Sequence, residues 1–207
     1  MPSTQHAYDH VAGVFFPIAI AVFASVVIAL GVLLVAGRRR RVPGRGSEAN
    51  RLEGLYAVVL GAAAGVLVWV TFTAETPIDR LVTRPGLQVG VVAAQWSWTF
   101  RYANATTVRA VASWNPPVAV VPTGVEVQFN ATSRDVIHGF WIPQLHYLRQ
   151  VVPGYTTRFD LLFSKPGHYE GDCAVFCGVL HPQMHFEIQA VSPARFRHWL
   201  ASGGRSL

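Results

Sequence analysis

Charged residues are scarce in this sequence, and two long stretches contain none. Only 14% of the 207 residues are charged, whereas 51% are hydrophobic, a balance that is unusual for a soluble globular protein. Residues 11–36 and 54–74 carry no charge at all. At about 1.5 Å per residue, a helix of either length can cross a hydrocarbon layer of about 30 Å. We therefore predict a hairpin of two transmembrane helices over these residues, which anchors the chain in a lipid bilayer.

Lysine and arginine are missing from residues 1–10. This absence argues against a secretory signal peptide, because such peptides place basic residues before their apolar run. The arginines follow the first apolar stretch instead, at residues 38–41, 45 and 51. Because short loops rich in arginine stay in the cytoplasm, we predict that the hairpin loop lies inside and that everything after residue 75 lies outside.

Lysine is nearly absent, with one lysine against sixteen arginines. This composition suggests a GC-rich prokaryotic genome, so the predicted location is the plasma (inner) membrane, with the outer domain on the periplasmic side. The net charge of +6 requires no nucleic-acid partner, because six arginines lie in the hairpin loop and the start of the second stretch. From Glu75 onward the chain has eleven basic and eight acidic residues. This net charge of +3 gives no reason to expect an acidic docking patch.

Short β-prone runs separated by turn signals fill the chain from Leu87 onward. Many short strands with Pro–Gly and Pro–Pro punctuation are typical of a β-sandwich or barrel. Ser192 and Pro193 are suited to the N-cap and first position of a helix. The sequence thus predicts an N-terminal tail and hairpin over residues 1–82 and an all-β outer domain with a short C-terminal helix over 83–207. The strand candidates are residues 89–102, 125–129, 157–163 and 185–191.

The chain has only two cysteines, and neither follows an apolar stretch as a lipid-anchor cysteine would. Cys173 and Cys177 share a twelve-residue segment with His181 and Met184, and His138 lies upstream. Soft sulfur ligands combined with imidazole select copper over hard cations. A mononuclear blue-copper site needs one cysteine, so the second cysteine indicates two copper ions bridged by two thiolates.

Two alternatives compete with this interpretation. A disulfide is possible in an oxidising compartment, but a loop this small gains little stability from it, and it leaves His181 and Met184 unexplained. A zinc site of two cysteines and two histidines fits the spacing as well, but gives Met184 no role.

The pattern Cys-x-x-x-Cys-x-x-x-His-x-x-Met with an upstream His resembles subunit II of cytochrome c oxidase, over nearly the whole chain. The resemblance implies a two-helix transmembrane hairpin followed by a cupredoxin-like Greek-key domain that holds the binuclear copper A centre. It implies that the two cysteines bridge the coppers, that each histidine binds one copper, and that the methionine binds the copper paired with the upstream histidine. A backbone carbonyl completes the implied set, which is His138, Cys173, Val175 (carbonyl), Cys177, His181 and Met184.

Position 175 departs from the family pattern. The family usually has a glutamate there, whose side chain also binds a structural Mg²⁺ at the interface with the catalytic subunit. Val175 has no side-chain oxygen. Copper ligation needs only the carbonyl and should survive, whereas the Mg²⁺ site is in doubt.

The resemblance extends to two residues outside the ligand set. Trp96 matches the family's first tryptophan in a Gln-Trp-x-Trp segment, and in the family that tryptophan accepts electrons from the donor. The alternative is that the segment is a strand whose aromatic side chains pack in the core. We prefer this alternative for Trp98 and Phe100. Glu53 precedes Tyr56 by three residues, as does a family glutamate at the mouth of a proton path into the catalytic subunit. The alternative for Glu53 is an interfacial residue close to Arg51.

Other residues near the motif have less specific predicted roles. Asp172 and Glu170 flank it and could orient ligands. We expect four apolar residues to surround the motif and exclude water from it, which are Phe140, Trp141, Val175 and Phe176. We predict surface or supporting positions for the histidines outside the ligand set, which are His146, His168, His185 and His198.

The resemblance implies a subunit of cytochrome c oxidase, a proton-translocating oxidoreductase of the respiratory chain. The subunit would accept electrons from cytochrome c or a similar donor and pass them to haem in catalytic subunit I, with subunit III as a further partner. The chain has no haem motif, so O₂ reduction would occur in another subunit. Two alternatives are the copper A subunit of a nitric-oxide reductase and a membrane-tethered copper-delivery protein.

Overall fold

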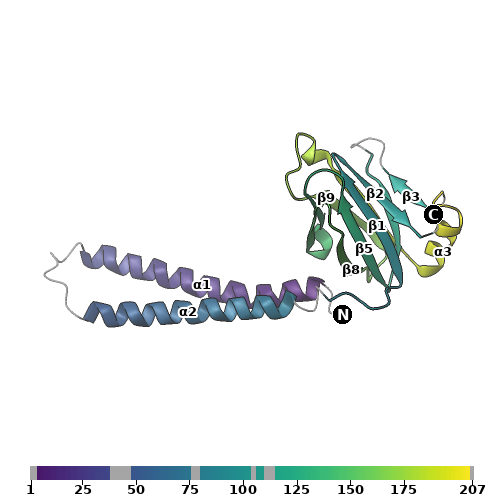
Figure 1. Cartoon of the computed structure of the whole chain (residues 1–207). Helices are drawn as coiled ribbons and strands as arrows, with labels where there is room; N and C mark the ends of the chain where they lie inside the picture. Colours follow the sequence, from purple (N-terminus) through teal and green to yellow (C-terminus); the bar gives the residue numbers. More distant parts are fainter. Residues whose placement is uncertain (1–3, 38–47, 76–79, 104–105, 110–114, 206–207) are drawn as a thin grey trace. The chain divides into compact units, whose positions relative to one another are not determined.

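The computed structural model describes residues 4–37, 48–75, 80–103, 106–109 and 115–205. The chain divides into two compact units, one that contains essentially residues 6–77 and one that contains residues 78–207. The arginines at positions 38–41 and 45 lie outside the described residues. The fold class predicted from the sequence is confirmed, because two apolar helices precede a domain built from two β-sheets (Figure 1).

The first unit contains α1 (Thr4–Gly37) and α2 (Glu48–Glu75). Within them, His6–Val32 and Gly54–Ala74 are long and apolar enough to cross a membrane. Most of their described large apolar side chains are exposed, which in water would be costly and in lipid is not. Glu53 lies near the start of α2, but its side chain is outside the described part of the chain, so its role stays a prediction.

The second unit is a sandwich of two five-stranded sheets. The first sheet has the order β3 (Thr107–Arg109), β2 (Ser97–Tyr102), β1 (Leu87–Ala94), β5 (Glu126–Ser133) and β8 (Thr157–Leu162). The second has the order β4 (Val118–Pro122), β10 (His185–Val191), β9 (Gly167–Cys173), β6 (His138–Ile142) and β7 (Tyr147–Val151). Two short 3₁₀ turns, Pro143–Leu145 and His181–Gln183, and the helix α3 (Pro193–Ala201) complete it. Ser192 caps α3 by accepting a hydrogen bond from the Arg195 N–H, as its residue type predicts.

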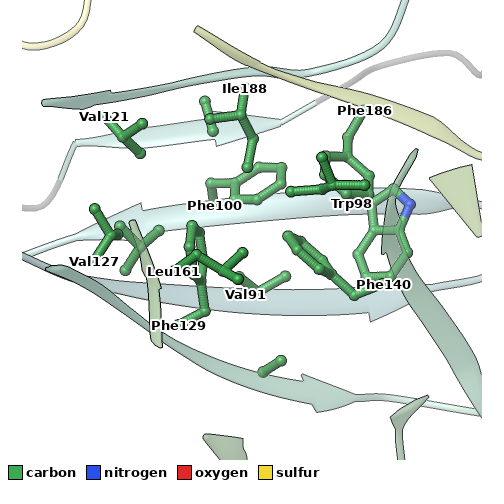
Figure 2. Packing of buried hydrophobic residues seen from close by; sticks show 14 of the residues in the cluster. Val91, Trp98, Phe100, Val121, Val127, Phe129, Phe140, Leu161, Phe186 and Ile188 are labelled. Carbon is green, nitrogen blue, oxygen red and sulfur yellow. The ribbon is translucent and has the colours of Figure 1, made fainter. Parts of the chain in front are cut away.

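Aromatic side chains from both sheets fill the space between them (Figure 2). Trp98 and Phe100 are fully buried, which confirms their predicted place in the core. The Phe140 and Phe186 rings stack with centroids 4.5 Å apart, and Trp98 meets Phe186 edge-on at 5.2 Å. These pairs add about 0.5–1.5 kcal/mol each to the stabilisation from burial alone, and Phe140 is the cross-strand neighbour of Cys173.

One strand prediction was wrong. Residues 89–102 do not form one strand, because Gln95 and Trp96 make a two-residue turn between β1 and β2. The strands pair antiparallel on either side of it, with Ala94 opposite Ser97. A run of β-prone residues does not by itself reveal where the chain reverses, and this run lacks the Asn–Gly or Asp–Gly signal that usually marks a tight hairpin. Trp96 is therefore a turn residue.

Gly171 on β9 tests the packing of the aromatic core. It lies opposite Phe186, and a Cβ at this position would come within 2.2 Å of the Phe186 ring. We expect Gly171→Ala to lower the free energy of unfolding by about 1–3 kcal/mol, because a full core cannot absorb the added methyl group. Gly90→Ala on β1 is the matched control, since its nearest neighbour is 3.6 Å away. Chemical denaturation of both variants would show equal stabilities if the core were loosely packed.

Candidate metal centre

The predicted ligands meet at one edge of the second sheet because of how its strands run. β6 and β9 are antiparallel neighbours, with Phe140 opposite Cys173. His138 opens β6 and Cys173 closes β9, so both lie at the same edge. Cys177 and His181 follow in the loop between β9 and β10, and Met184 immediately precedes β10.

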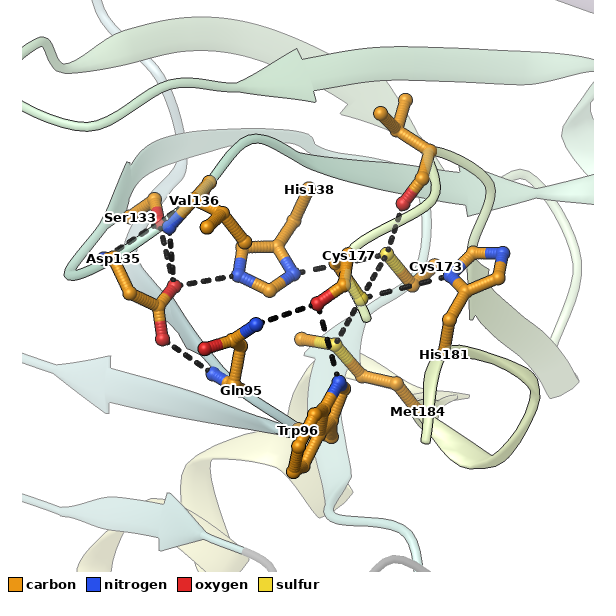
Figure 3. A network of polar contacts seen from close by, with 11 residues as sticks. Gln95, Trp96, Ser133, Asp135, Val136, His138, Cys173, Cys177, His181 and Met184 are labelled. Atoms are coloured by element: carbon orange, nitrogen blue, oxygen red, sulfur yellow. Dashed lines mark hydrogen bonds and ion pairs between the residues drawn. The ribbon is translucent and has the colours of Figure 1, made fainter. Parts of the chain in front are cut away.

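The structure brings together all six atoms of the predicted ligand set (Figure 3). The Sγ atoms of Cys173 and Cys177 are 3.7 Å apart. His138 Nδ1 lies 3.7 Å from the sulfur of Cys173, and His181 Nδ1 lies 3.6 Å from that of Cys177. Met184 Sδ is 3.8 Å from the sulfur of Cys177, and the Val175 carbonyl oxygen is 3.3 Å from that of Cys173. Both thiols are free, so the two cysteines do not form a disulfide.

Four side chains of the centre are buried, whereas His181 is half-buried. Cys173 and Cys177 are 6% and 3% exposed, and His138 and Met184 are buried. Among the described residues, His138, Cys173 and Cys177 form the group whose ligand atoms all lie within 4.8 Å of one another. Phe140 lies beneath them in the core. Phe176 and Trp141 are 80% and 37% exposed, so our prediction of a buried surround was wrong for these two, because the loop and β6 turn them toward solvent.

Asp135 orients His138, a role that the sequence did not suggest. Its Oδ1 lies 2.8 Å from His138 Nε2. The carboxylate also accepts hydrogen bonds from the N–H groups of Val136 (2.7 Å) and Gln95 (2.6 Å). A proton on Nε2 leaves Nδ1 unprotonated and free to bind a metal, the usual arrangement for a ligating histidine. Asp172, which we expected to orient ligands, instead contacts His185 on the outer surface.

The two thiols differ in acidity because they are close. Burial opposes ionisation of Cys173, but contacts with the His138 imidazole and with the backbone at Gly139 and Val175 lower its pKa to about 6. Burial, and then the negative charge on Cys173, raise the pKa of Cys177 to about 12. The pKa of His138 is raised: burial opposes this, but its contacts with Cys173 and Asp135 prevail. Both thiols ionise together only if positive charge is supplied, so this donor set fits soft metal cations.

The Gln95–Trp96 turn holds the ligand loop from the side. Gln95 Nε2 donates to the Cys177 carbonyl at 2.7 Å, and Trp96 Nε1 donates to the same oxygen at 3.2 Å. Trp96 is half-buried and supplies no ligand atom. Sequence reasoning missed the contact made by Gln95, since 82 residues separate it from Cys177.

Comparisons with known proteins place the chain in a family. The family model described as cytochrome C oxidase subunit II, periplasmic domain, matches residues 87–191. A protein of Streptomyces avermitilis described as "Probable cytochrome c oxidase subunit 2" is 32% identical over 225 residues, which cover 87% of this chain and 70% of the relative. The chain belongs to the cytochrome c oxidase subunit II family. It is therefore a membrane-anchored subunit of an oxidoreductase complex, with a copper-binding domain.

Two further comparisons are consistent with this family. A Nocardia farcinica protein of the same description is 39% identical over 213 residues, which cover 72% of this chain and 57% of the relative. The crystal structure of the periplasmic domain of subunit II of the Bradyrhizobium japonicum cytochrome oxidase has a TM-score of 0.52 and 23% identity, and covers 59% of this chain and 96% of that domain. At this identity the likeness concerns the fold alone. The chain spans little more than half of the Nocardia relative, which is longer.

Gly139 and Val175 test how the backbone shapes this site. A Cβ at Gly139 would come within 2.8 Å of the Val175 N and 3.0 Å of the Ala174 N, so Gly139→Ala should push the ligand loop outward and lower copper occupancy. Val175→Ala should leave the copper spectrum largely intact, since the group of Val175 that lies near the Cys173 sulfur is its carbonyl, and should cost no more than about 1–2 kcal/mol of stability, because the side chain is half-buried. Metal analysis and visible absorption of both variants check this. Loss of copper from a folded Val175→Ala protein would contradict it.

Proposed function

We propose that this subunit accepts electrons at a binuclear copper A centre and passes them to haem in the catalytic subunit of a terminal haem-copper oxidase, which reduces O₂. The observation that carries the proposal is the convergence of two thiols, two imidazoles and a thioether at one buried edge of the sheet, joined by the Val175 carbonyl. This ligand set exceeds the needs of a single copper and leaves no ligand without a role. The donor would be cytochrome c or a similar protein, and subunits I and III the partners.

Each residue has a distinct part in holding the centre. Cys173 and Cys177 would bridge two coppers, with His138 and Met184 on one and His181 on the other, and with the Val175 carbonyl as a further ligand. Copper A, when bound, takes up and releases one electron at a time with the charge change shared between two metals. Asp135 fixes the tautomer and direction of His138. Burial of the cysteines, His138 and Met184 excludes water and limits reorganisation of the surroundings.

The burial of both cysteines supports this role over copper delivery. A delivery site must release its metal, which favours open ligands with easy exchange. In this chain Cys173 and Cys177 are almost fully buried. The catalytic subunit decides between an oxidase and a nitric-oxide reductase, and the features of this chain suit either enzyme. Val175 offers no side-chain oxygen to a Mg²⁺ ion, so we do not propose that this chain contributes a side chain to a Mg²⁺ site.

The metal content of the protein tests the proposal directly. We predict two coppers per chain, and we predict that His138→Asn disrupts the centre because the asparagine cannot replace the Nδ1 ligand atom. His168→Asn is the matched control, since His168 is exposed on β9 away from the cysteines. Metal analysis and visible absorption on a reconstituted outer domain that begins near Thr83 check both variants. One copper, or zinc, per chain would refute the binuclear centre.

Trp96 is proposed as the contact through which electrons arrive. Its indole donates to the Cys177 carbonyl. A short path of one hydrogen bond and the covalent bonds of Cys177 therefore joins the indole to the Cys177 sulfur. We predict that Trp96→Ala slows reduction by the donor at least several-fold while the copper absorbance stays normal. Tyr155→Ala, which removes an exposed aromatic from another loop, should have little effect. The reduction rate is normalised to the absorbance of intact copper A. If this normalised rate were unchanged in Trp96→Ala, Trp96 would be a packing residue only.

A further inference from the structure

A small hollow on the outer face of the first sheet is lined by cations and hydroxyl groups. It has a volume of about 160 Å³. Arg101 on β2 and Arg134 after β5 border it, together with Ser97, Thr99 and Thr107. Pockets that bind drug-sized ligands measure about 300–1,000 Å³, so this hollow fits a group of side-chain size.

The strand register explains why these side chains face outward. Side chains alternate between the two faces of a strand, and Phe100 on β2 is buried in the core. Its neighbours Thr99 and Arg101 therefore face away from it. Arg101 lies opposite Gly90 on β1 and Thr107 on β3, so no large side chain beside it covers the guanidinium. The N–H of Arg134 donates to the Ala93 carbonyl at 3.0 Å, which fixes its backbone beside β1.

The two guanidinium groups are exposed and have no carboxylate partner in the part of the chain that the structure describes. The neighbouring carboxylate of Asp135 is engaged by His138, Val136 and Gln95. Paired guanidiniums beside hydroxyl groups form a strong site for carboxylate oxygens, which arginine binds in a bidentate manner.

Three carboxylates lie close together on the other sheet, whereas Glu126 on β5 and Asp160 on β8 belong to the first sheet. Glu187 and Glu170 are opposite each other on β10 and β9, with Asp172 next along β9. Asp172 contacts His185, and Glu187 lies 3.8 Å from His168. Asp172 and Glu187 thus each have a histidine nearby, whereas neither arginine of the hollow has a carboxylate partner among the described residues. An approaching protein would find uncompensated charge at the arginines.

The hollow adjoins the turn that contacts the metal centre. Ala94 and Ser97, which line it, flank Gln95 and Trp96, and both turn residues donate to the Cys177 carbonyl. We propose that Arg101 and Arg134 receive carboxylates of an acidic electron-donor protein and seat it beside Trp96. This inference rests on the proposed electron-accepting function. It gives the donor a negatively charged docking face, in keeping with the net charge of +3 on the outer part of the chain.

The test uses the assembled oxidase with the full chain, and two c-type cytochromes of opposite net charge as probes. Stopped-flow absorbance gives the second-order rate constant for copper A reduction at low and high ionic strength. The acidic cytochrome should react faster at low ionic strength. Arg101→Gln/Arg134→Gln should lower its rate constant about tenfold and flatten the salt dependence, as expected for lost electrostatic steering. The charge-preserving Arg101→Lys/Arg134→Lys should keep most of the rate.

The matched control is Glu170→Gln/Glu187→Gln on the other sheet, which should change the rate with the acidic cytochrome little. An unchanged rate in the Arg→Gln variant overturns the proposal. So does a wild-type preference for the basic cytochrome that the Glu→Gln variant abolishes, because docking would then occur at the acidic surface. Normal copper A absorbance in each variant separates a failure of docking from a failure of the proposed function, which would appear as missing absorbance in the wild type.

Discussion

The arrangement of the metal centre depends on two buried thiols that the outer domain holds close together. The sulfur atoms of Cys173 and Cys177 lie 3.7 Å apart and almost out of contact with water, where like charges repel strongly. The surroundings favour ionisation of the first thiol, through His138 and nearby backbone groups, and oppose that of the second. Only cations placed between the sulfurs and the imidazoles offset this charge. With both thiols ionised, this arrangement would be unfavourable by itself, and bound copper would make it favourable.

Support for that arrangement comes from parts of the chain far from the ligand loop. Asp135 directs His138, and the same carboxylate accepts a hydrogen bond from the Gln95 N–H. Gln95 in turn donates from its side chain to the Cys177 carbonyl. The β1–β2 turn is therefore connected by hydrogen bonds to both halves of the site. The same turn lies beside the arginine-lined hollow, so the proposed docking surface and the proposed electron contact would share one short hairpin.

The convergence of these side chains was predictable because four of the proposed ligands lie within twelve residues, at spacings that a single loop imposes. The two apolar helices were also predictable, because their length and lack of charge suit the hydrocarbon interior of a bilayer. The supporting contacts were not predictable. Gln95 and Cys177 meet only because β1 and β9 belong to sheets that face each other, and Asp135 was overlooked although it lies three residues before His138. The exposure of Phe176 was also missed, since hydrophobic character alone does not determine which way a loop residue turns.

The central claim is that two copper ions share the two thiolates. X-ray absorption at the copper edge, measured on the oxidised protein together with its electron paramagnetic resonance spectrum, tests it most directly. The account predicts sulfur and nitrogen neighbours, a second copper close to the first, and one unpaired electron with hyperfine coupling to two equivalent copper nuclei. Hyperfine coupling to one copper nucleus, with no metal neighbour in the absorption data, would contradict it.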